Sequence, residues 1–356
     1  MPRQRVQLPW KTNDRCPCRS GEIYGRCCKA PEHSPRAKKF DLERAANQTG
    51  KDRAGCYLAG YQNCGEKLTI EHPISRNILE QFSNLGIRGF SGTDGTVDVV
   101  VPPKSAGYKV LCDHHNSDLS LLDTHAGQVF RDIIDAVLPI RHAQKKQLLN
   151  WVYVDGPKLE AWSTKVIAAH QAAGKLSNGG RPVTYQVDWN KIRRAILKGE
   201  FEPNGGLYIC DAIAPNEVVG VQYHGVHCNG WLVGVRVVMG SFSFMTIFDP
   251  VRASGDTIPR NATYRSSIHQ LYAQGGSAFL FFAWRTRAKI KSWSRGEIRY
   301  SQHGSSSFAP FHQLSGFPAQ DLRTSPKPLK DGKASEFAPA PVGKVLPPSP
   351  PFKNTD

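Results

Sequence analysis

The chain has 356 residues, 40% of them hydrophobic, and this length and composition allow about two compact domains with cores of their own. Lysine and arginine outnumber aspartate and glutamate by 46 to 30, so the formal net charge of +16 favours an anionic partner, with nucleic acid ahead of an anionic membrane surface. No run approaches the roughly 18 apolar residues of a membrane span, and the polar, basic start lacks the apolar region of a secretory signal.

These features exclude a membrane-spanning or secreted protein, and we therefore expect a cytoplasmic one. In a reducing compartment the nine cysteines are better explained as metal ligands and buried thiols than as disulfides. Their distribution agrees, since four fall within residues 16–28 and three more at positions 56, 64 and 112.

Composition divides the chain into six segments and predicts the α+β fold class. We expect a zinc knuckle with a basic flank, a linker, a second cysteine and histidine domain, a helical segment, a β-rich domain and a disordered proline-rich tail, at residues 1–30, 31–50, 51–125, 126–200, 201–316 and 317–356, respectively. The tail holds 9 of the 25 prolines and shows almost no periodicity.

The first cysteine cluster has the spacing C-x-C-x8-C-C, formed by Cys16, Cys18, Cys27 and Cys28. Four soft thiolate ligands suit tetrahedral Zn²⁺, and the Ser20-Gly21 turn allows the two pairs to meet. So small a segment cannot bury a core of its own, and metal binding has to supply its folding energy.

This segment, residues 14–29, resembles the SEC-C motif, a zinc knuckle found on many unrelated bacterial proteins. The matching residues are Cys16, Pro17, Cys18, Ser20, Gly21, Tyr24, Cys27 and Cys28. Arg19 departs from the motif, in which glycine is usual at that place. The resemblance implies a structural zinc ion and an accessory role as an adaptor that contacts a protein partner. The basic residues around the motif fit either phosphate contact or an ordinary solvated surface.

The second cluster supplies another set of zinc ligands. Cys112 and His115 have the C-x2-H spacing of a zinc knuckle, and Cys56 and Cys64 would supply the other pair across a longer loop. Together they predict a structural Cys3His site. His114 is an alternative ligand to His115, with the less usual C-x-H spacing.

Residues suited to phosphodiester chemistry lie between and beside these ligands. In the sequence IEHPISR, His72 is placed to act as a general base on water, and Glu71 to hold Mg²⁺ or a similar ion. Asn116 follows the second knuckle directly, so the zinc site would fix it at the start of a helix facing these two residues. Asp123 is a weaker metal candidate, because such carboxylates are more often exposed to solvent.

Residues 54–123 resemble the HNH (ββα-metal, treble-clef) endonuclease superfamily, in which a cysteine pair, an acidic-His hairpin and a C-x2-[Cys/His] knuckle follow in this order. The resemblance implies a treble-clef core, with His72 as general base, Glu71 and Asn116 at a catalytic Mg²⁺ or Mn²⁺, and structural zinc on Cys56, Cys64, Cys112 and His115. The chain departs from the family in its C-x7-C pair, in its long connection from His72 to Cys112, and in Asn116, where histidine is commoner.

Further elements are predicted by periodicity. Residues 97–101 are expected to form a strand that ends at Pro102. Apolar residues at helical spacing from Val129 to Val137 predict a helix that Pro139 kinks or ends. Helices are also expected over 157–173 and 190–198, and a short one over 37–46.

Short strands rich in β-branched and aromatic residues are expected from Gly206 to Trp284, as an antiparallel sheet. Residues 223–228 carry two histidines and a cysteine, which we interpret as incidental to a hairpin turn. Residues 284–295 interleave tryptophans with basic residues, which fits base stacking and phosphate contact as well as it fits a half-buried edge strand.

The sequence as a whole predicts an HNH-type endonuclease that hydrolyses phosphodiester bonds in DNA, with two structural zinc ions and a catalytic Mg²⁺ or Mn²⁺. The alternative is a non-catalytic adaptor, in which both zinc modules serve only to bind nucleic acid or protein.

Overall fold

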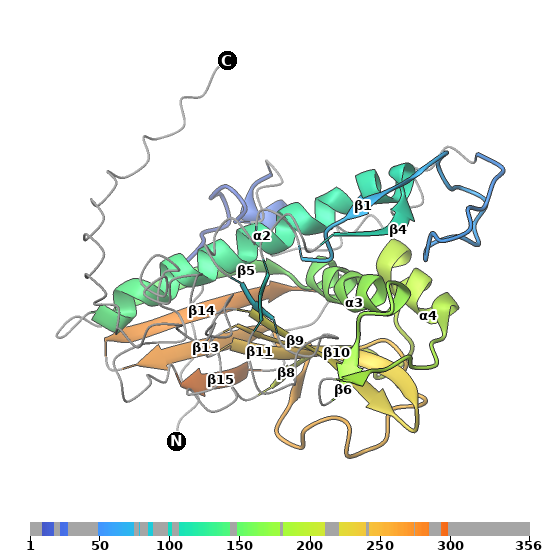
Figure 1. Cartoon of the computed structure of the whole chain (residues 1–356). Coiled ribbons are helices and arrows are strands. Elements are labelled where there is room, and N and C mark those ends of the chain that lie inside the picture. Colours follow the sequence, from blue (N-terminus) through green and yellow to red (C-terminus); the bar gives the residue numbers. More distant parts are fainter. Residues whose placement is uncertain are drawn as a thin grey trace, which may run out of the picture.

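The computed structural model describes thirteen stretches of the chain. They are residues 9–17, 22–27, 49–74, 78, 85–87, 99–101, 107–142, 148–178, 181–210, 221–239, 242–273, 275–284 and 293–297. Within them, helices and mainly antiparallel sheets are combined, so the α+β fold class is confirmed (Figure 1). The expected helix over 37–46, the basic stretch 285–292 and the tail 317–356 lie outside the described residues.

The helices are α2 (Asp113–His142), α3 (Gly156–Ala172) and α4 (Trp189–Arg193), which continues as the π-helical turn η6 (Arg194–Lys198). A 3₁₀ turn, η1, spans Tyr24–Arg26. Asp155 caps the start of α3, where its carboxylate accepts the backbone N–H of Lys158, and Gly174 follows the end with φ +62°. The helices predicted over 157–173 and 190–198 are thus confirmed, whereas α2 continues through Pro139 instead of ending there.

The first sheet has five antiparallel strands in the order β12-β8-β11-β10-β9. They are β8 (Gly206–Cys210), β9 (Val221–Cys228), β10 (Trp231–Met239), β11 (Phe242–Ile247) and β12 (Thr263–Tyr264). Asn229 and Gly230, both with positive φ, form the tight turn between β9 and β10. The predicted hairpin is therefore present, and its two histidines lie in strand β9 before the turn.

The second sheet has the order β15-β13-β14-β5 and contains parallel pairs. Its strands are β5 (Leu148–Asp155), β13 (Ile268–Ala273), β14 (Gly276–Ala283) and β15 (Trp293–Glu297). Strand β5 lies in the segment expected to be helical, yet it pairs in parallel with β14 from the expected β-rich domain. The second sheet therefore contains strands from both sides of the predicted boundary at residue 200. The expectation of a purely antiparallel sheet is wrong for this second sheet.

Three two-stranded pairs complete the strands. β1 (Leu68–Glu71) pairs with β4 (Tyr108–Cys112), β2 (Leu85–Ile87) with β3 (Val99–Val101), and β6 (Ser177–Asn178) with β7 (Arg181–Pro182), each antiparallel. The strand predicted over 97–101 is thus confirmed for its last three residues. The register of β1 and β4 shifts between Thr69 and Glu71, which is where the predicted catalytic hairpin begins.

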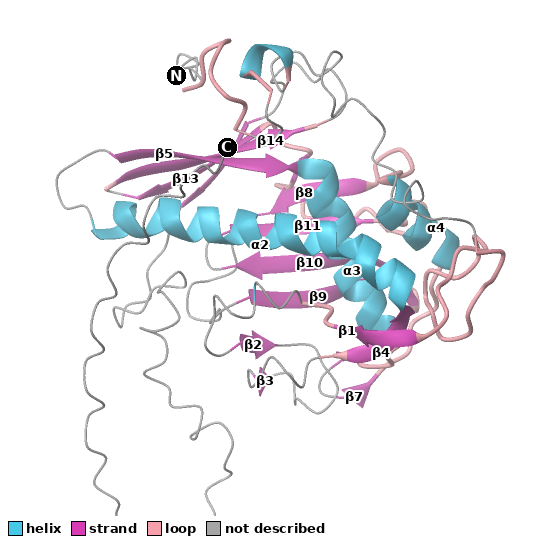
Figure 2. Cartoon of the chain, turned by 90° about the horizontal axis from the view of Figure 1, so that it is seen from above, coloured by secondary structure: helices cyan, strands magenta, loops and turns pink. Residues whose placement is uncertain are grey.

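A single large core joins these parts. Helix α3 is buried along nearly its whole length, and with α2 it lies over the strands of both sheets (Figure 2). Trp162 of α3 is fully buried, with the ring of Phe130 from α2 at a centroid distance of 5.2 Å. The same core reaches from Cys56 to Phe282, so the hairpin of β1 and β4 rests on the two sheets instead of standing apart. No helix in the described segments combines the length and apolar character needed to cross a lipid bilayer.

The N-terminal knuckle, defined here as residues 9–17 and 22–27, packs on the second sheet through Trp10. The ring centroid of Trp10 lies 5.6 Å from that of Phe281, 5.7 Å from Trp151 and 5.8 Å from Tyr24 of the knuckle itself. Where the knuckle meets α2 and β5, a cleft of about 480 Å³ opens. The knuckle is thus joined to the body by an aromatic cluster.

Replacing Trp10 by alanine is expected to lower the stability of this junction by about 1–3 kcal/mol, because the aromatic contacts and the apolar area that they cover are lost. Limited proteolysis and the tryptophan fluorescence spectrum would detect the loosened knuckle. Trp10→Phe, which keeps an aromatic ring, is the control. If the alanine variant resists protease as well as the parent does, Trp10 does not hold the knuckle on the second sheet.

Candidate metal centre and the adjoining hairpin

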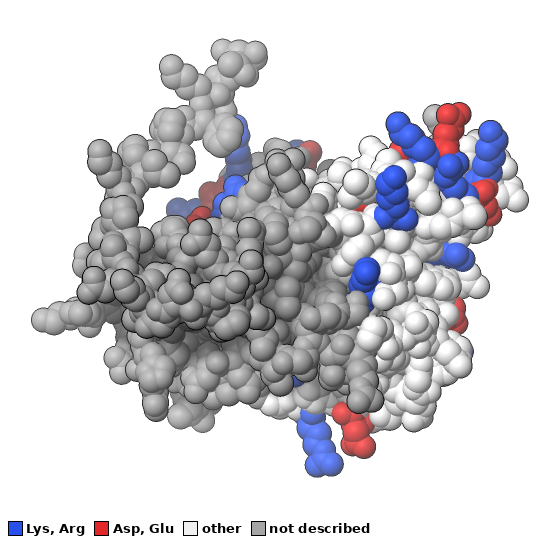
Figure 3. Space-filling model, viewed as in Figure 1, with Lys and Arg blue, Asp and Glu red and all other residues white. Residues whose placement is uncertain are grey.

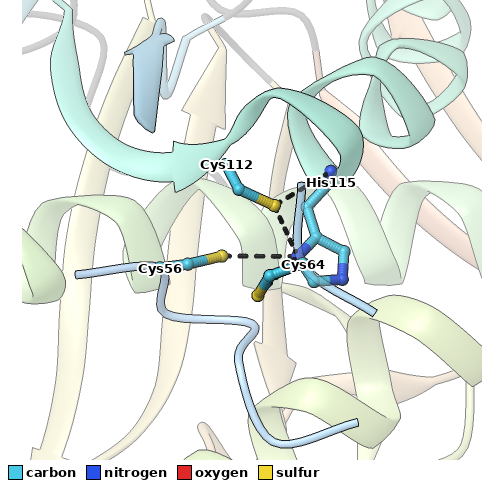
Figure 4. A group of neighbouring side chains, drawn as sticks. All are labelled: Cys56, Cys64, Cys112 and His115. Atoms are coloured by element: carbon cyan, nitrogen blue, oxygen red, sulfur yellow. Dashed lines mark hydrogen bonds between the residues drawn. The ribbon is translucent and has the colours of Figure 1, made fainter. Parts of the chain in front are cut away.

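Four buried side chains from three places in the chain form a group suited to a metal ion (Figure 4). Cys56 and Cys64 come from the loop before β1, Cys112 ends β4, and His115 lies in the first turn of α2. Their ligand atoms all lie within 4.8 Å of one another, and no other such group occurs in the described residues. The sequence-predicted Cys3His set is therefore brought together.

The ring of His115 is oriented for ligation. Its Nδ1 faces the sulfurs of Cys112, Cys56 and Cys64 at 3.2, 3.3 and 3.9 Å. On the far side of the ring, Nε2 lies 3.1 Å from Oδ1 of the buried Asn63 and donates to it. A hydrogen bond of this kind fixes the tautomer of a ligating histidine and raises its basicity. Sequence reasoning missed Asn63, and its place directly before Cys64 was the available signal.

Backbone groups support the sulfur of Cys112. The N–H groups of Gly65 and His115 donate to its Sγ at 3.3 and 3.4 Å. A side chain at Gly65 would collide with the carboxylate of Asp113, so the loop approaches the start of α2 this closely only with glycine. The pKa of the Cys112 thiol is lowered to about 3, first by a hydrogen bond from the Cys56 thiol and also by the backbone N–H groups of His115 and Gly65, while the pKa of Cys56 is raised.

A thiolate carrying donated hydrogen bonds, two further sulfurs and an imidazole nitrogen form a soft donor set, which suits a tetrahedral ion. The chemistry of these four residues therefore fits zinc. His114 lies outside the group, because its Nε2 faces Asp118 at 3.4 Å, and the alternative ligand set with His114 is not the one that the fold assembles.

The N-terminal knuckle is described only in part. Cys16 and Cys27 are both buried, and the N–H of Cys16 donates to the carbonyl of Glu22 at 2.8 Å. Cys18 and Cys28 lie outside the described residues, so the four-cysteine zinc site remains a prediction.

Glu71 is engaged in a buried ion pair. Its side chain is 2% exposed, and its Oε1 lies 2.6 Å from Nζ of Lys165, a residue of α3 whose side chain is fully buried. The same ammonium donates to both carboxylate oxygens of Asp123 on α2 at 2.6 Å. Asp123 is therefore not a solvent carboxylate, and the carboxylate of Glu71 points into the core of the molecule, away from solvent.

The charge of Lys165 is maintained by this arrangement. Burial alone would lower the pKa of the ammonium, but the carboxylates of Glu71 and Asp123 outweigh burial and raise it. Lys165 is thus protonated at neutral pH. Sequence reasoning missed this residue, since a lysine in a helix is ordinarily solvated.

Asn116 and His72 both adjoin β1. The amide nitrogen of Asn116 donates to Oγ1 of Thr69 at 3.0 Å and to the carbonyl of Ile70 at 3.2 Å, which ties the first turn of α2 to β1. The half-buried ring of His72 follows at the end of the strand and lies beside Gly107. Asn116 therefore contacts β1 at Thr69 and Ile70, whereas His72 follows the strand where Glu71 pairs with Tyr108, and the carboxylate of Glu71 turns inward.

Comparisons with protein-family models, with curated proteins and with solved structures found no match to this chain. Both resemblances thus rest on the motifs themselves. On the face shown in Figure 3, basic and acidic side chains are interspersed over the described part of the surface.

Proposed function

We propose that the chain is an HNH-type endonuclease that hydrolyses phosphodiester bonds in DNA and is stabilised by zinc on Cys56, Cys64, Cys112 and His115. The proposal is carried by the amide of Asn116, which joins α2 to β1 one residue after a zinc ligand, while His72 follows the last residue of the same strand. A histidine base and an amide that adjoin one strand are the residue types that this chemistry uses, and they support the proposal. The net charge of +16 supports a polyanionic substrate.

In this proposal His72 takes the proton from the attacking water. The amide of Asn116 uses its nitrogen in both hydrogen bonds to β1, which leaves its oxygen for a cation or for substrate. Mg²⁺ usually keeps several waters and binds through one or two protein groups and the substrate phosphate, so the Asn116 oxygen fits such an ion. A bound Mg²⁺ or Mn²⁺ would supply charge stabilisation at the phosphate. Glu71 does not fit as a ligand, because Lys165 already neutralises its carboxylate.

The inward position of Glu71 favours a second candidate function. Without a carboxylate at the end of β1, the zinc-stabilised hairpin would serve as a non-catalytic adaptor that binds nucleic acid or, through the N-terminal knuckle, a protein. Binding and cleavage therefore have to be measured separately.

The test is plasmid nicking by the full chain with Mg²⁺ or Mn²⁺, with gel-shift binding measured in parallel. His72→Ala is expected to lower the cleavage rate about 10²–10⁴-fold, the usual contribution of a general base, with unchanged zinc content and DNA affinity. His227→Ala, which removes an exposed histidine stacked on Tyr185, is the control for loss of a histidine outside the hairpin. Equal cleavage by the His72 variant and the parent would refute the assignment, and binding without any cleavage would favour the adaptor.

A further inference from the structure

The ion pair between helix α3 and strand β1 sets a fully buried ammonium between two carboxylates. Nζ of Lys165 lies 2.6 Å from Oε1 of Glu71 and 2.6 Å from both oxygens of Asp123, and the lysine side chain has no exposed surface. The contacts to Asp123 are charge-assisted hydrogen bonds at the short end of their range, and the contact to Glu71 is an ion pair. The ammonium thus has the surroundings that a bound cation would have, two carboxylates from two elements, of which the Glu71 side chain is 2% and the Asp123 side chain 23% exposed.

We propose that Lys165 is an intrinsic cation of this hairpin, which bars a divalent ion from Glu71 by occupying the position between the Glu71 and Asp123 carboxylates. The consequence for the proposed function is that any metal at the hairpin is held without Glu71, through Asn116 and the substrate. Lys165 is then a positioning residue, because it contacts Glu71 and no reacting atom.

The exclusion follows from charge and burial. A divalent ion that bound Glu71 here would have to displace the ammonium, and Lys165 lies in the buried middle of α3 with no exposed side-chain surface of its own. Two cations at one site would repel each other strongly in a region of low dielectric constant. An uncompensated buried charge is among the most destabilising features in a protein. The carboxylates therefore bind either the ammonium or a metal ion.

Removal of the ammonium is expected to create a divalent-cation site. In Lys165→Met, a side chain of similar length without charge leaves Glu71 and Asp123 facing a common space. These two carboxylates supply hard oxygen ligands, which suit Mn²⁺. The site would need both carboxylates, and Glu71→Gln in the same chain would abolish it.

The experiment titrates the zinc-loaded full chain with Mn²⁺ and follows free Mn²⁺ by electron paramagnetic resonance together with the melting temperature. The parent and Glu71→Gln are expected to bind Mn²⁺ equally. Lys165→Met is expected to gain one Mn²⁺ per chain and to melt roughly 5 °C or more higher when Mn²⁺ is at a hundredfold excess over its dissociation constant. The double variant Lys165→Met/Glu71→Gln should show neither change.

Two results would overturn the proposal. A loss of Mn²⁺ binding in Glu71→Gln relative to the parent would show that Glu71 binds a divalent ion despite Lys165. If Lys165→Met folds but binds no more Mn²⁺ than the parent, the ammonium does not occupy a position that a divalent cation could take. If Lys165→Met fails to fold, the comparison between the parent and Glu71→Gln decides alone. The cation role of Lys165 rests on the proposed nuclease function only for its catalytic consequence. Because this experiment measures Mn²⁺ binding and no DNA cleavage, the cation role and the nuclease function can fail separately.

Discussion

Cys112→Ser is expected to remove one equivalent of zinc from the protein and to loosen the hairpin of β1 and β4 together with the first turn of α2. Cys112 ends β4, lies 3.2 Å from Nδ1 of His115 and accepts two backbone N–H groups, so its loss affects every part of the centre. Zinc binding contributes roughly 10–16 kcal/mol in small zinc-finger peptides near neutral pH, so even partial loss would exceed the effect of an ordinary core substitution.

The measurement is bound zinc per chain by elemental analysis, together with thermal unfolding. Cys210→Ser is the matched control, because Cys210 is also buried but belongs to none of the metal-binding groups in the described residues. The control is expected to keep the zinc content of the parent. Full zinc content in the Cys112 variant would contradict the Cys3His centre.

Glu160→Ala is expected to destabilise the fold by about 1–3 kcal/mol, since it removes a buried carboxylate that accepts hydrogen bonds from a half-buried guanidinium and a buried N–H. The Glu160 side chain is 1% exposed. Its carboxylate accepts Nε and Nη2 of Arg265 at 2.8 and 3.1 Å and the N–H of Leu207 at 2.8 Å. The substitution leaves a half-buried guanidinium and a buried N–H without these partners, at the place where α3 meets the first sheet.

Chemical denaturation monitored by circular dichroism would measure this effect. Glu200→Ala is the control, because its pair with Arg194 is longer, at 3.3 Å, and both side chains are substantially exposed. Pairs of that kind contribute about 0–1 kcal/mol. If the two variants lose similar stability, the buried carboxylate of Glu160 contributes no more to stability than the more exposed one of Glu200.

The Cys3His centre could be predicted because its information is local. The C-x2-H spacing of Cys112 and His115 at the start of a helix specifies half of the ligand set, and two earlier cysteines supply the rest. The strands of the first sheet were also predictable, since turn residues such as Asn229 and Gly230 punctuate them. In each case neighbouring residues carry the signal.

The engagement of Glu71 was not predictable, because its partner lies on a distant element and nothing in the local sequence marks Lys165 as buried. Strand β5 was missed for a related reason. Its residues alternate, with Val152 and Val154 facing the large core and Trp151 and Tyr153 the aromatic cluster, yet it stands alone between two helices. Its partner β14 follows much later in the chain, so the pairing is decided by the tertiary fold.

The packing of Trp10 has a consequence for dissecting the molecule. A shortened chain that begins after the knuckle would present Trp151 and Phe281 to water, and a newly exposed aromatic surface on a sheet promotes self-association. Poor solubility of such a fragment would then report an uncovered surface and not a failure of the remaining chain to fold. A fragment that carries polar residues at those two positions would be the more suitable starting point for crystallisation.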